Sequence, residues 1–122
     1  MYSVETDSAK RFVVISASGH VTGDEVKAAA TEVAALVENF APGFAALTDF
    51  RWLTSMDAAG AQYIAKIMDL LAARRVGKVI RVMPDPHKDI GLNILSHFHY
   101  GPDVQIATYQ KLADALEHLT SA

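Results

Sequence analysis

The side chains best able to do chemistry are concentrated in residues 49–60, which read D-F-R-W-L-T-S-M-D-A-A-G. This stretch supplies two carboxylates, Asp49 and Asp57, and two hydroxyls, on Thr54 and Ser55. The pattern predicts the end of a buried strand, a short exposed turn and the start of a helix. Such a turn presents backbone N–H groups and a few side chains at the carboxyl edge of a sheet, where α/β proteins commonly bind their ligands.

Four residues of the stretch each allow two interpretations. Asp57 is either a partner contact or the N-cap of the following helix, and capping alone explains it. Asp49 is either an acid at the site or a side chain that hydrogen-bonds the following turn. Gly60 is predicted to allow a close approach between a helix and a strand, rather than the close approach of a ligand to the backbone. Trp52, the only tryptophan, either anchors a protein partner, as aromatic side chains do at interfaces, or forms a partly buried lid over the core.

The histidines do not predict a metal site. His97 and His99 are two residues apart, so they do not face each other on a helix, and no third ligand is near them in the sequence. His20 and His87 follow predicted strands near one edge of the sheet, where they lie near a pocket or are solvated loop residues.

Catalysis finds little support in the sequence. It has no G-x-S-x-G nucleophile turn, no P-loop, no G-x-G-x-x-G fingerprint and no cysteine. We therefore predict that the chain is not an enzyme and needs no cofactor. The lack of cysteine also excludes disulfides and fits a reducing cytoplasm, the location we expect.

Composition sets the class of protein. The chain has 122 residues, of which 51% are hydrophobic and 20% charged, so we expect one folded domain spanning residues 1–122. The net charge is -3 and the basic residues are scattered, which argues against a nucleic-acid partner. No apolar stretch approaches the ~20 residues that a membrane-spanning helix needs.

Strands and helices alternate along most of the chain. Gly19 and His20 are predicted to end the second strand, and Gly77 to end the second helix. The helix starts are a capping box at Thr22, Asp57 as an N-cap, Asp85 followed by proline, and Thr108. The predicted strands are residues 2–5, 11–18, 44–50, 78–83 and 104–107.

The order β-β-α-β-α-β-α-β-α predicts an α/β fold with a mixed, mostly parallel sheet flanked by helices. The first strand is expected to be antiparallel at one edge. The sequence leaves open which helices cover which face.

This order, taken with the central stretch, resembles a STAS domain, the SpoIIAA-like fold of bacterial anti-sigma factor antagonists. In that family a strand ends in an acidic residue, and a turn leads to a D-S-S-G motif at a helix start. Here Asp49 matches the acid, Leu53 and Met56 match the apolar positions, and residues 57–60, D-A-A-G, match the motif without a gap.

The departure from that motif has a direct consequence. In the phosphorylated members the modified residue is the serine immediately before the glycine, which here is Ala59, and the other serine is replaced by Ala58. Neither side chain can accept a phosphoryl group. Ser55 and Thr54 keep hydroxyls, but both are predicted to lie before the cap, away from the helix N-terminus that stabilises a phosphate.

The resemblance implies a non-catalytic regulatory module that binds an anti-sigma factor or a related protein and is not switched at the usual serine. Its expected partner-binding residues are Trp52, Ser55, Asp57, Ala58, Ala59 and Gly60. The alternative is a SpoIIAA-like carrier of a small apolar ligand or lipid. It is suggested by the third helix, apolar over much of its circumference, although a homodimer surface or burial on both sides explains that helix equally well. Its apolar residues are Ile90, Leu92, Ile94, Leu95 and Phe98.

Overall fold

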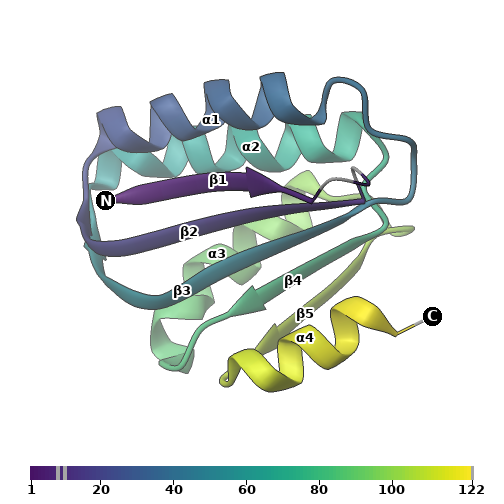
Figure 1. Ribbon diagram of the computed structural model, residues 1–122. Helices are drawn as coiled ribbons and strands as arrows, with labels where there is room; N and C mark the ends of the chain where they lie inside the picture. The colour runs from purple at the N-terminus through teal and green to yellow at the C-terminus, as the bar shows by residue number, and fades with distance from the viewer. Residues whose placement is uncertain (8, 10, 122) are drawn as a thin grey trace.

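A computed structural model describes residues 1–7, 9 and 11–121 (Figure 1). The order of strands and helices is the predicted one, with a single 3-10 turn, η1, added before the second helix. The strands are β1 Tyr2–Thr6, β2 Phe12–Val21, β3 Ala45–Met56, β4 Lys78–Val82 and β5 Gln105–Tyr109. The helices are α1 Gly23–Val37, η1 Ala58–Gly60, α2 Ala61–Ala73, α3 Pro86–His99 and α4 Leu112–Thr120.

The five strands form one sheet in the order β1-β2-β3-β4-β5. β1 pairs antiparallel with β2 at one edge, and every other neighbouring pair is parallel. This is the predicted mixed sheet, because a short turn can join only antiparallel neighbours while each helix returns the chain to a parallel start. The parallel strands therefore end together at one carboxyl edge.

The helices are divided unequally between the two faces of the sheet. α1, α2 and α3 cover one face, and α4 alone lies on the other (Figure 1). Alternate side chains of β2 follow this division: Val13 and Ile15 belong to the larger core under α1 and α2, whereas Phe12 and Val14 pack towards α4. A sheet covered this way keeps part of its second face open to solvent.

The second and third strands run past their predicted ends. β2 continues through Gly19 and His20 to Val21, and β3 continues to Met56, so the exposed turn expected after Phe50 is strand instead. The residues of the two extensions pair with each other across β2 and β3, with register shifts that mark two irregularities. Neither extension was visible in the sequence because exposed residues, Gly19 and His20 in β2 and Thr54 and Ser55 in β3, interrupt the apolar pattern.

The capping predictions were confirmed for α1 and α3. Thr22 Oγ1 accepts a hydrogen bond from the backbone N–H of Glu25 at 3.2 Å, and Glu25 Oε1 accepts one from the backbone N–H of Thr22 at 3.2 Å. Asp85 accepts from the backbone N–H of His87 at 3.0 Å, and Pro86 occupies the first helical position. Both helix starts are encoded locally.

Two other helix boundaries were predicted wrongly. Thr108 lies inside β5, and α4 begins only at Leu112, because pairing with β4 holds the chain extended for longer. α2 ends at Ala73, ahead of Gly77, and the turn that follows places Arg75 at a positive φ of 61°. Gly77 serves another purpose, since a Cβ there would come within 3.0 Å of the Gly43 carbonyl oxygen.

The apolar side chains of α3 are shared between core and surface. Ser96 is the one fully buried residue of this helix, while Ile90, Ile94 and Phe98 are exposed. In α4, Leu116 is also exposed. Within the part of the chain that the structure describes, no helix has the length and apolar character needed to cross a membrane.

Candidate functional site

The ends of β2 and β3 bring together residues that are far apart in the sequence. His20 lies opposite Ser55 in the sheet, and Val21 lies opposite Met56. The pairing continues one step further, where the Asp57 N–H donates to the Val21 carbonyl at 3.0 Å. As a result, Asp57 leaves β3 beside the point where the chain turns from β2 into α1.

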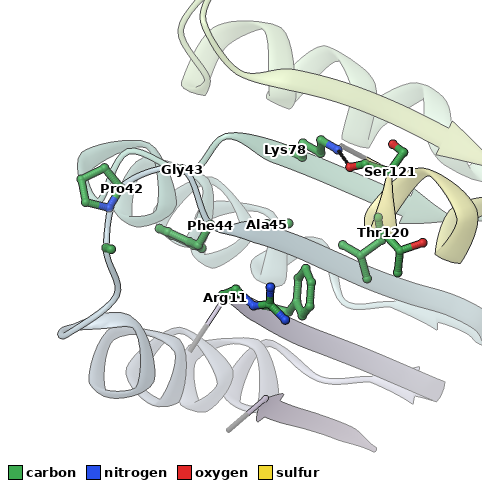
Figure 2. A pocket seen from close by; sticks show the side chains of 11 residues that line it. Arg11, Pro42, Gly43, Phe44, Ala45, Lys78, Thr120 and Ser121 are labelled. Carbon is green, nitrogen blue, oxygen red and sulfur yellow. Dashed lines mark hydrogen bonds between the residues drawn. The ribbon is translucent and has the colours of Figure 1, made fainter. Parts of the chain in front are cut away.

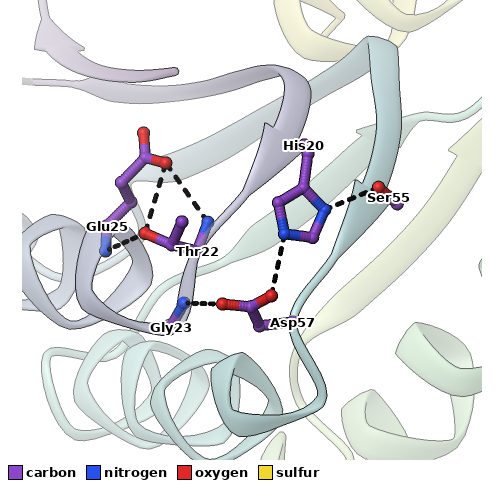
Figure 3. Close-up of polar contacts among 6 residues, drawn as sticks. All are labelled: His20, Thr22, Gly23, Glu25, Ser55 and Asp57. Atoms are coloured by element: carbon purple, nitrogen blue, oxygen red, sulfur yellow. Dashed lines mark hydrogen bonds and ion pairs between the residues drawn. The ribbon is translucent and has the colours of Figure 1, made fainter.

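Asp57 does not cap the helix that follows it, which corrects the prediction. Its side chain makes no capping bond to η1 or α2. One carboxylate oxygen, Oδ2, instead accepts from the backbone N–H of Gly23, the first residue of α1, at 3.0 Å (Figure 3). The other, Oδ1, lies 2.8 Å from His20 Nε2. The Asp57 carboxylate therefore links the residue before η1 to the first residue of α1.

These contacts favour the ionised form of the Asp57 carboxylate. The hydrogen bond from the Gly23 N–H, followed by the one from His20, lowers the pKa of Asp57 below its ordinary value. Negative charge beside the N-terminus of α1 is also favoured by the helix dipole.

His20 completes a chain of three polar groups from Ser55 to Asp57. Its Nδ1 lies 2.7 Å from Ser55 Oγ. Because an ionised carboxylate only accepts, His20 Nε2 carries the proton given to Asp57, and in the neutral ring Nδ1 accepts from the Ser55 hydroxyl. The order hydroxyl, imidazole, carboxylate is that of an activated nucleophile. However, the side chains of His20 and Asp57 are 50% and 44% exposed, so water competes for every bond.

The sequence did not reveal this cluster. His20 was expected to be a solvated loop residue or one near a pocket, and it is a strand residue with two side-chain partners. The available signal was that His20 and Asp57 each stand at the end of consecutive parallel strands, which meet at one sheet edge.

The segment equivalent to the expected motif lies at the surface. Asp57, Ala58 and Ala59 are exposed, while Gly60 is buried. A Cβ on Gly60 would come within 3.1 Å of Met56 Sδ and 3.1 Å of Val26 Cγ2. The prediction that Gly60 allows a close approach was therefore confirmed, with α1 and the end of β3 as its neighbours.

Trp52 is 67% exposed, so the interpretation of it as a partly buried lid is wrong. The irregularity between Ser16 and Ser18 places Trp52 opposite Ser18. There it borders a hollow of about 270 Å³ on the open part of the sheet, next to Asp49 and Arg51. The Arg51 guanidinium carbon lies 5.6 Å from the centre of the Trp52 ring.

Asp49 hydrogen-bonds the residues after it, as predicted. Its Oδ1 accepts from the Arg51 backbone N–H at 3.2 Å and from Arg51 Nε at 3.0 Å, and its Oδ2 accepts from Nη2 at 2.9 Å. Partial burial alone raises the pKa of Asp49, but the hydrogen bonds and charge of Arg51 outweigh it and hold the pKa below its ordinary value. Asp49 therefore fixes the Arg51 side chain beside Trp52.

A hollow of about 660 Å³ lies at the opposite, amino edge of the sheet (Figure 2). It is bordered by the starts of β2, β3 and β4 and by the end of α4. Lys78 Nζ is already engaged there, donating to the Ser121 carbonyl at 2.9 Å and the His118 carbonyl at 3.3 Å. No predicted site residue lies in this hollow, which separates it from the cluster at the carboxyl edge.

The remaining histidines do not converge. His99 Nδ1 lies 2.6 Å from Asp69 Oδ1, whereas His87 lies in the first turn of α3. Among residues 1–7, 9 and 11–121, no three or more His, Asp or Glu side chains are arranged to hold a metal ion.

Comparison with known proteins identifies the fold of this chain from solved structures alone. No protein-family model and no curated protein matches the chain. Solved structures do match along its length. The anti-sigma factor antagonist SpoIIAA in its unphosphorylated form superposes with a TM-score of 0.70 at 17% identity, covering 100% of both chains.

Two further structures agree with that match. An uncharacterized DUF3478-family protein with a SpoIIAA-like fold, from Shewanella loihica PV-4, has a TM-score of 0.70 at 17% identity and covers 98% of this chain and 92% of its own. An anti-sigma factor antagonist from Mycobacterium paratuberculosis has a TM-score of 0.61 at 19% identity, covering 99% and 96%. This chain therefore has the SpoIIAA-like STAS fold that its sequence predicted.

Proposed function

We propose that the chain is a non-catalytic regulatory module of the anti-sigma factor antagonist type. Its docking surface comprises Trp52, Ser55, Asp57, Ala58, Ala59 and Gly60, and its partner is an anti-sigma factor or a related regulatory protein. The observation that carries the proposal is the exposure of Ala58 and Ala59 on a turn held at both ends. Asp57 ties it to α1, and the buried Gly60 packs against Val26.

This geometry favours protein docking. Two small apolar side chains on a fixed turn offer a partner a shallow contact that needs little ordering, and an exposed tryptophan is a frequent anchor residue. The fold adds support, because two of the similar structures are described as anti-sigma factor antagonists.

The usual phosphorylation switch is absent from the proposed module. One of the similar structures is a Bacillus SpoIIAA in a phosphorylated form, which shows that the modification occurs on this fold. A phosphate would add a charge of about -1.5 to -2 to the surface. Ala58 and Ala59 have no hydroxyl to receive it, so the docking surface keeps one charge state at these positions.

The binding test is a calorimetric titration with each anti-sigma factor encoded in the source genome. Trp52→Ala and Ala58→Glu should each weaken binding at least about tenfold, the first by removing an anchor and the second by adding a charge. Leu116→Ala is the control, because it removes an exposed apolar side chain from α4, outside the docking surface. Equal weakening of partner binding by all three variants would show that the partner does not dock on this surface.

The regulatory part has its own test. Ala59→Ser restores a hydroxyl before Gly60, and a kinase that acts on SpoIIAA-like proteins should add one phosphoryl group to this variant and none to the natural chain. Intact-mass measurement reads the result. A phosphoryl group mapped to Ser55 or Thr54 of the natural chain would show that the module is switched after all.

The alternative, a carrier of a small apolar ligand, has one observation in its favour. A small, partly open cavity with a mostly apolar lining lies under α2 and α3. Homodimer formation through the exposed Ile90, Ile94 and Phe98 stays a prediction, which light scattering on the purified chain would test.

A further inference from the structure

A surface groove of about 260 Å³ lies between α1 and α2. Its floor is apolar, formed by Ala30 and Ala34 of α1 and Leu70 of α2, and Tyr63 adds an aromatic ring. The side chains at a contact between two helices decide how well the space between them is filled, and the alanines of α1 are too small to fill it. The groove therefore offers exposed apolar area between two helices.

Two lysine side chains border this apolar floor, Lys27 from α1 and Lys66 from α2. Both are exposed, and neither belongs to an ion pair among the residues that the structure describes. The chain as a whole carries a net charge of -3, so two unpaired cations give this groove the opposite sign. Charge of one sign favours a partner surface of the other sign.

The acidic side chains of the same helices are engaged elsewhere or lie outside the groove. On α1, Glu25 pairs with the terminal amino group at 3.0 Å, and Glu32 accepts from a tyrosine hydroxyl of β1 at 3.2 Å. On α2, Asp69 Oδ1 lies 2.6 Å from His99 Nδ1 of α3. None of these acids lines the groove, and neither does Asp24 in the first turn of α1.

The groove begins one helical turn from the proposed docking surface. α1 follows β2 and α2 follows η1, so both helices start at the carboxyl edge of the sheet and run side by side (Figure 1). At that end the docking surface meets α1, since a Cβ on Gly23 would come within 3.2 Å of Ala59 Cβ. Lys27 lies one turn further along α1. A partner seated on Ala58 and Ala59 therefore has the groove beside it.

We infer that this groove extends the docking surface and accepts an amphipathic helix of the partner, apolar on one side and acidic on both flanks. The apolar side packs on Ala30, Ala34 and Leu70, and the flanking carboxylates pair with Lys27 and Lys66. Binding of such a helix in a groove is a common mode of recognition. The inference rests on the proposed docking function, because it names the chemistry of the partner at that surface.

The charges favour a protein segment over other anions. Binding to anionic lipid typically uses clusters of about 4–8 basic residues, whereas two lysines border this groove. Nucleic acid requires a basic stripe, and the net charge of -3 argues against one. A small free anion would leave the apolar floor uncovered.

The first test uses a synthetic helix of about 15 residues, held helical by a lactam bridge because isolated helices of this length are marginal. It carries leucine and alanine on one side and glutamate on both flanks, and a matched peptide has glutamine at every glutamate. NMR of isotope-labelled protein follows the amide signals of Lys27, Ala30 and Leu70. The acidic peptide should shift these signals saturably and bind about tenfold more tightly than the glutamine peptide. Equal affinity would overturn the inference.

Charge reversal locates the contact. Lys27→Glu and Lys66→Glu should each weaken binding of the acidic peptide about tenfold and leave the glutamine peptide unchanged. Lys111→Glu is the matched control, because it makes the same change of charge at an exposed position before α4, outside the groove. All three positions are exposed, so the variants should melt with the natural chain. An equal loss of affinity in Lys111→Glu would show a general effect of net charge and overturn the inference.

The same variants separate this inference from the proposed function. If an anti-sigma factor is weakened by Ala58→Glu but not by Lys27→Glu or Lys66→Glu, the docking surface is supported and the groove inference is overturned. If no anti-sigma factor binds, yet the acidic peptide binds through both lysines, the groove inference is supported and the proposed class of partner is wrong.

A membrane contact is the remaining outcome. The natural chain and Lys27→Glu are sedimented with vesicles of phosphatidylglycerol and phosphatidylcholine. We expect neither to bind. Binding of the natural chain that Lys27→Glu loses, without binding of the acidic peptide, would identify a lipid surface as the occupant and overturn the inference.

Discussion

Two of the acid–base pairs have opposite character. Arg81 and Asp89 join β4 to α3 inside the protein, with side chains 3% and 16% exposed. His20 and Asp57 join the ends of β2 and β3 at the surface, with side chains 50% and 44% exposed. Both pairs are short, at 2.7 Å and 2.8 Å, so distance does not distinguish them.

The difference lies in what happens when one partner is lost. A charge left alone in the interior has no water to solvate it, whereas a charge left alone at the surface is rehydrated. The interior pair therefore constrains the placement of α3, and the surface pair can change at little cost. A surface that can change at little cost is suited to partner binding, which is where we place the docking function.

The largest expected effect comes from breaking the buried pair. Asp89→Ala leaves the Arg81 guanidinium buried without its counter-charge and should lower the free energy of unfolding by about 3 kcal/mol. Urea denaturation at neutral pH measures it.

Asp69→Ala is the control for that variant, because Asp69 pairs with His99 from a side chain that is 61% exposed. Its loss should change the free energy of unfolding by less than about 1 kcal/mol. If Asp89→Ala and Asp69→Ala were equally stable, burial would not explain the difference in strength between buried and exposed pairs.

The next effect tests the one buried position in the docking surface. Gly60→Ala places a methyl group within 3.1 Å of both Met56 and Val26. Met56 can move but Val26 is buried, so we expect a loss of about 1–2 kcal/mol in the free energy of unfolding. Gly91→Ala on α3 meets no atom within 4 Å and should be neutral or stabilising.

Removing the surface carboxylate should have a smaller effect. Asp57→Ala loses the acceptor for the Gly23 N–H and should lower the melting temperature by a few degrees. Asp57→Asn keeps an amide oxygen that can accept the same bond, so calorimetry should find it closer to the natural chain. Equal losses in the two variants would mean that the charge, not the hydrogen bond, matters.

The same carboxylate should make stability depend on pH. Because the pKa of Asp57 is lowered in the folded chain, its ionised form stabilises the fold above the ordinary Asp pKa of about 4. This stabilisation is lost as the pH falls through the folded-state pKa. The difference in urea midpoint between the natural chain and Asp57→Asn should therefore be constant near neutral pH and shrink in acid.

The smallest expected effect on stability is at Trp52. Because its side chain is 67% exposed, Trp52→Ala should change the free energy of unfolding by no more than about 0.5 kcal/mol. Its effect should appear in partner affinity. A large loss of stability would mean that Trp52 supports the sheet, and the docking surface would then lose its anchor.

Local patterns were sufficient for much of the fold. The order of strands and helices along the chain, the edge position of β1 and the capping of α1 and α3 followed from apolar runs, Thr22 and Asp85. The ends of β2 and β3 did not, because Gly19, His20, Thr54 and Ser55 interrupt the apolar pattern and are held extended by the pairing of the two strands. The partner of Asp57 was missed because its carboxylate was assigned to the helix that follows it in the sequence, whereas the carboxylate accepts from the first residue of α1.

By itself, the sequence determined the class of fold, the starts of α1 and α3 and the lack of a hydroxyl at positions 58 and 59. These depend on residue type and spacing along a short length of chain. Only the tertiary structure decided which side chains meet His20, Asp57 and Arg81, and which helices cover each face of the sheet. The physical reason is that burial and hydrogen bonding between distant segments depend on how strands pair and helices pack, and no local pattern encodes either.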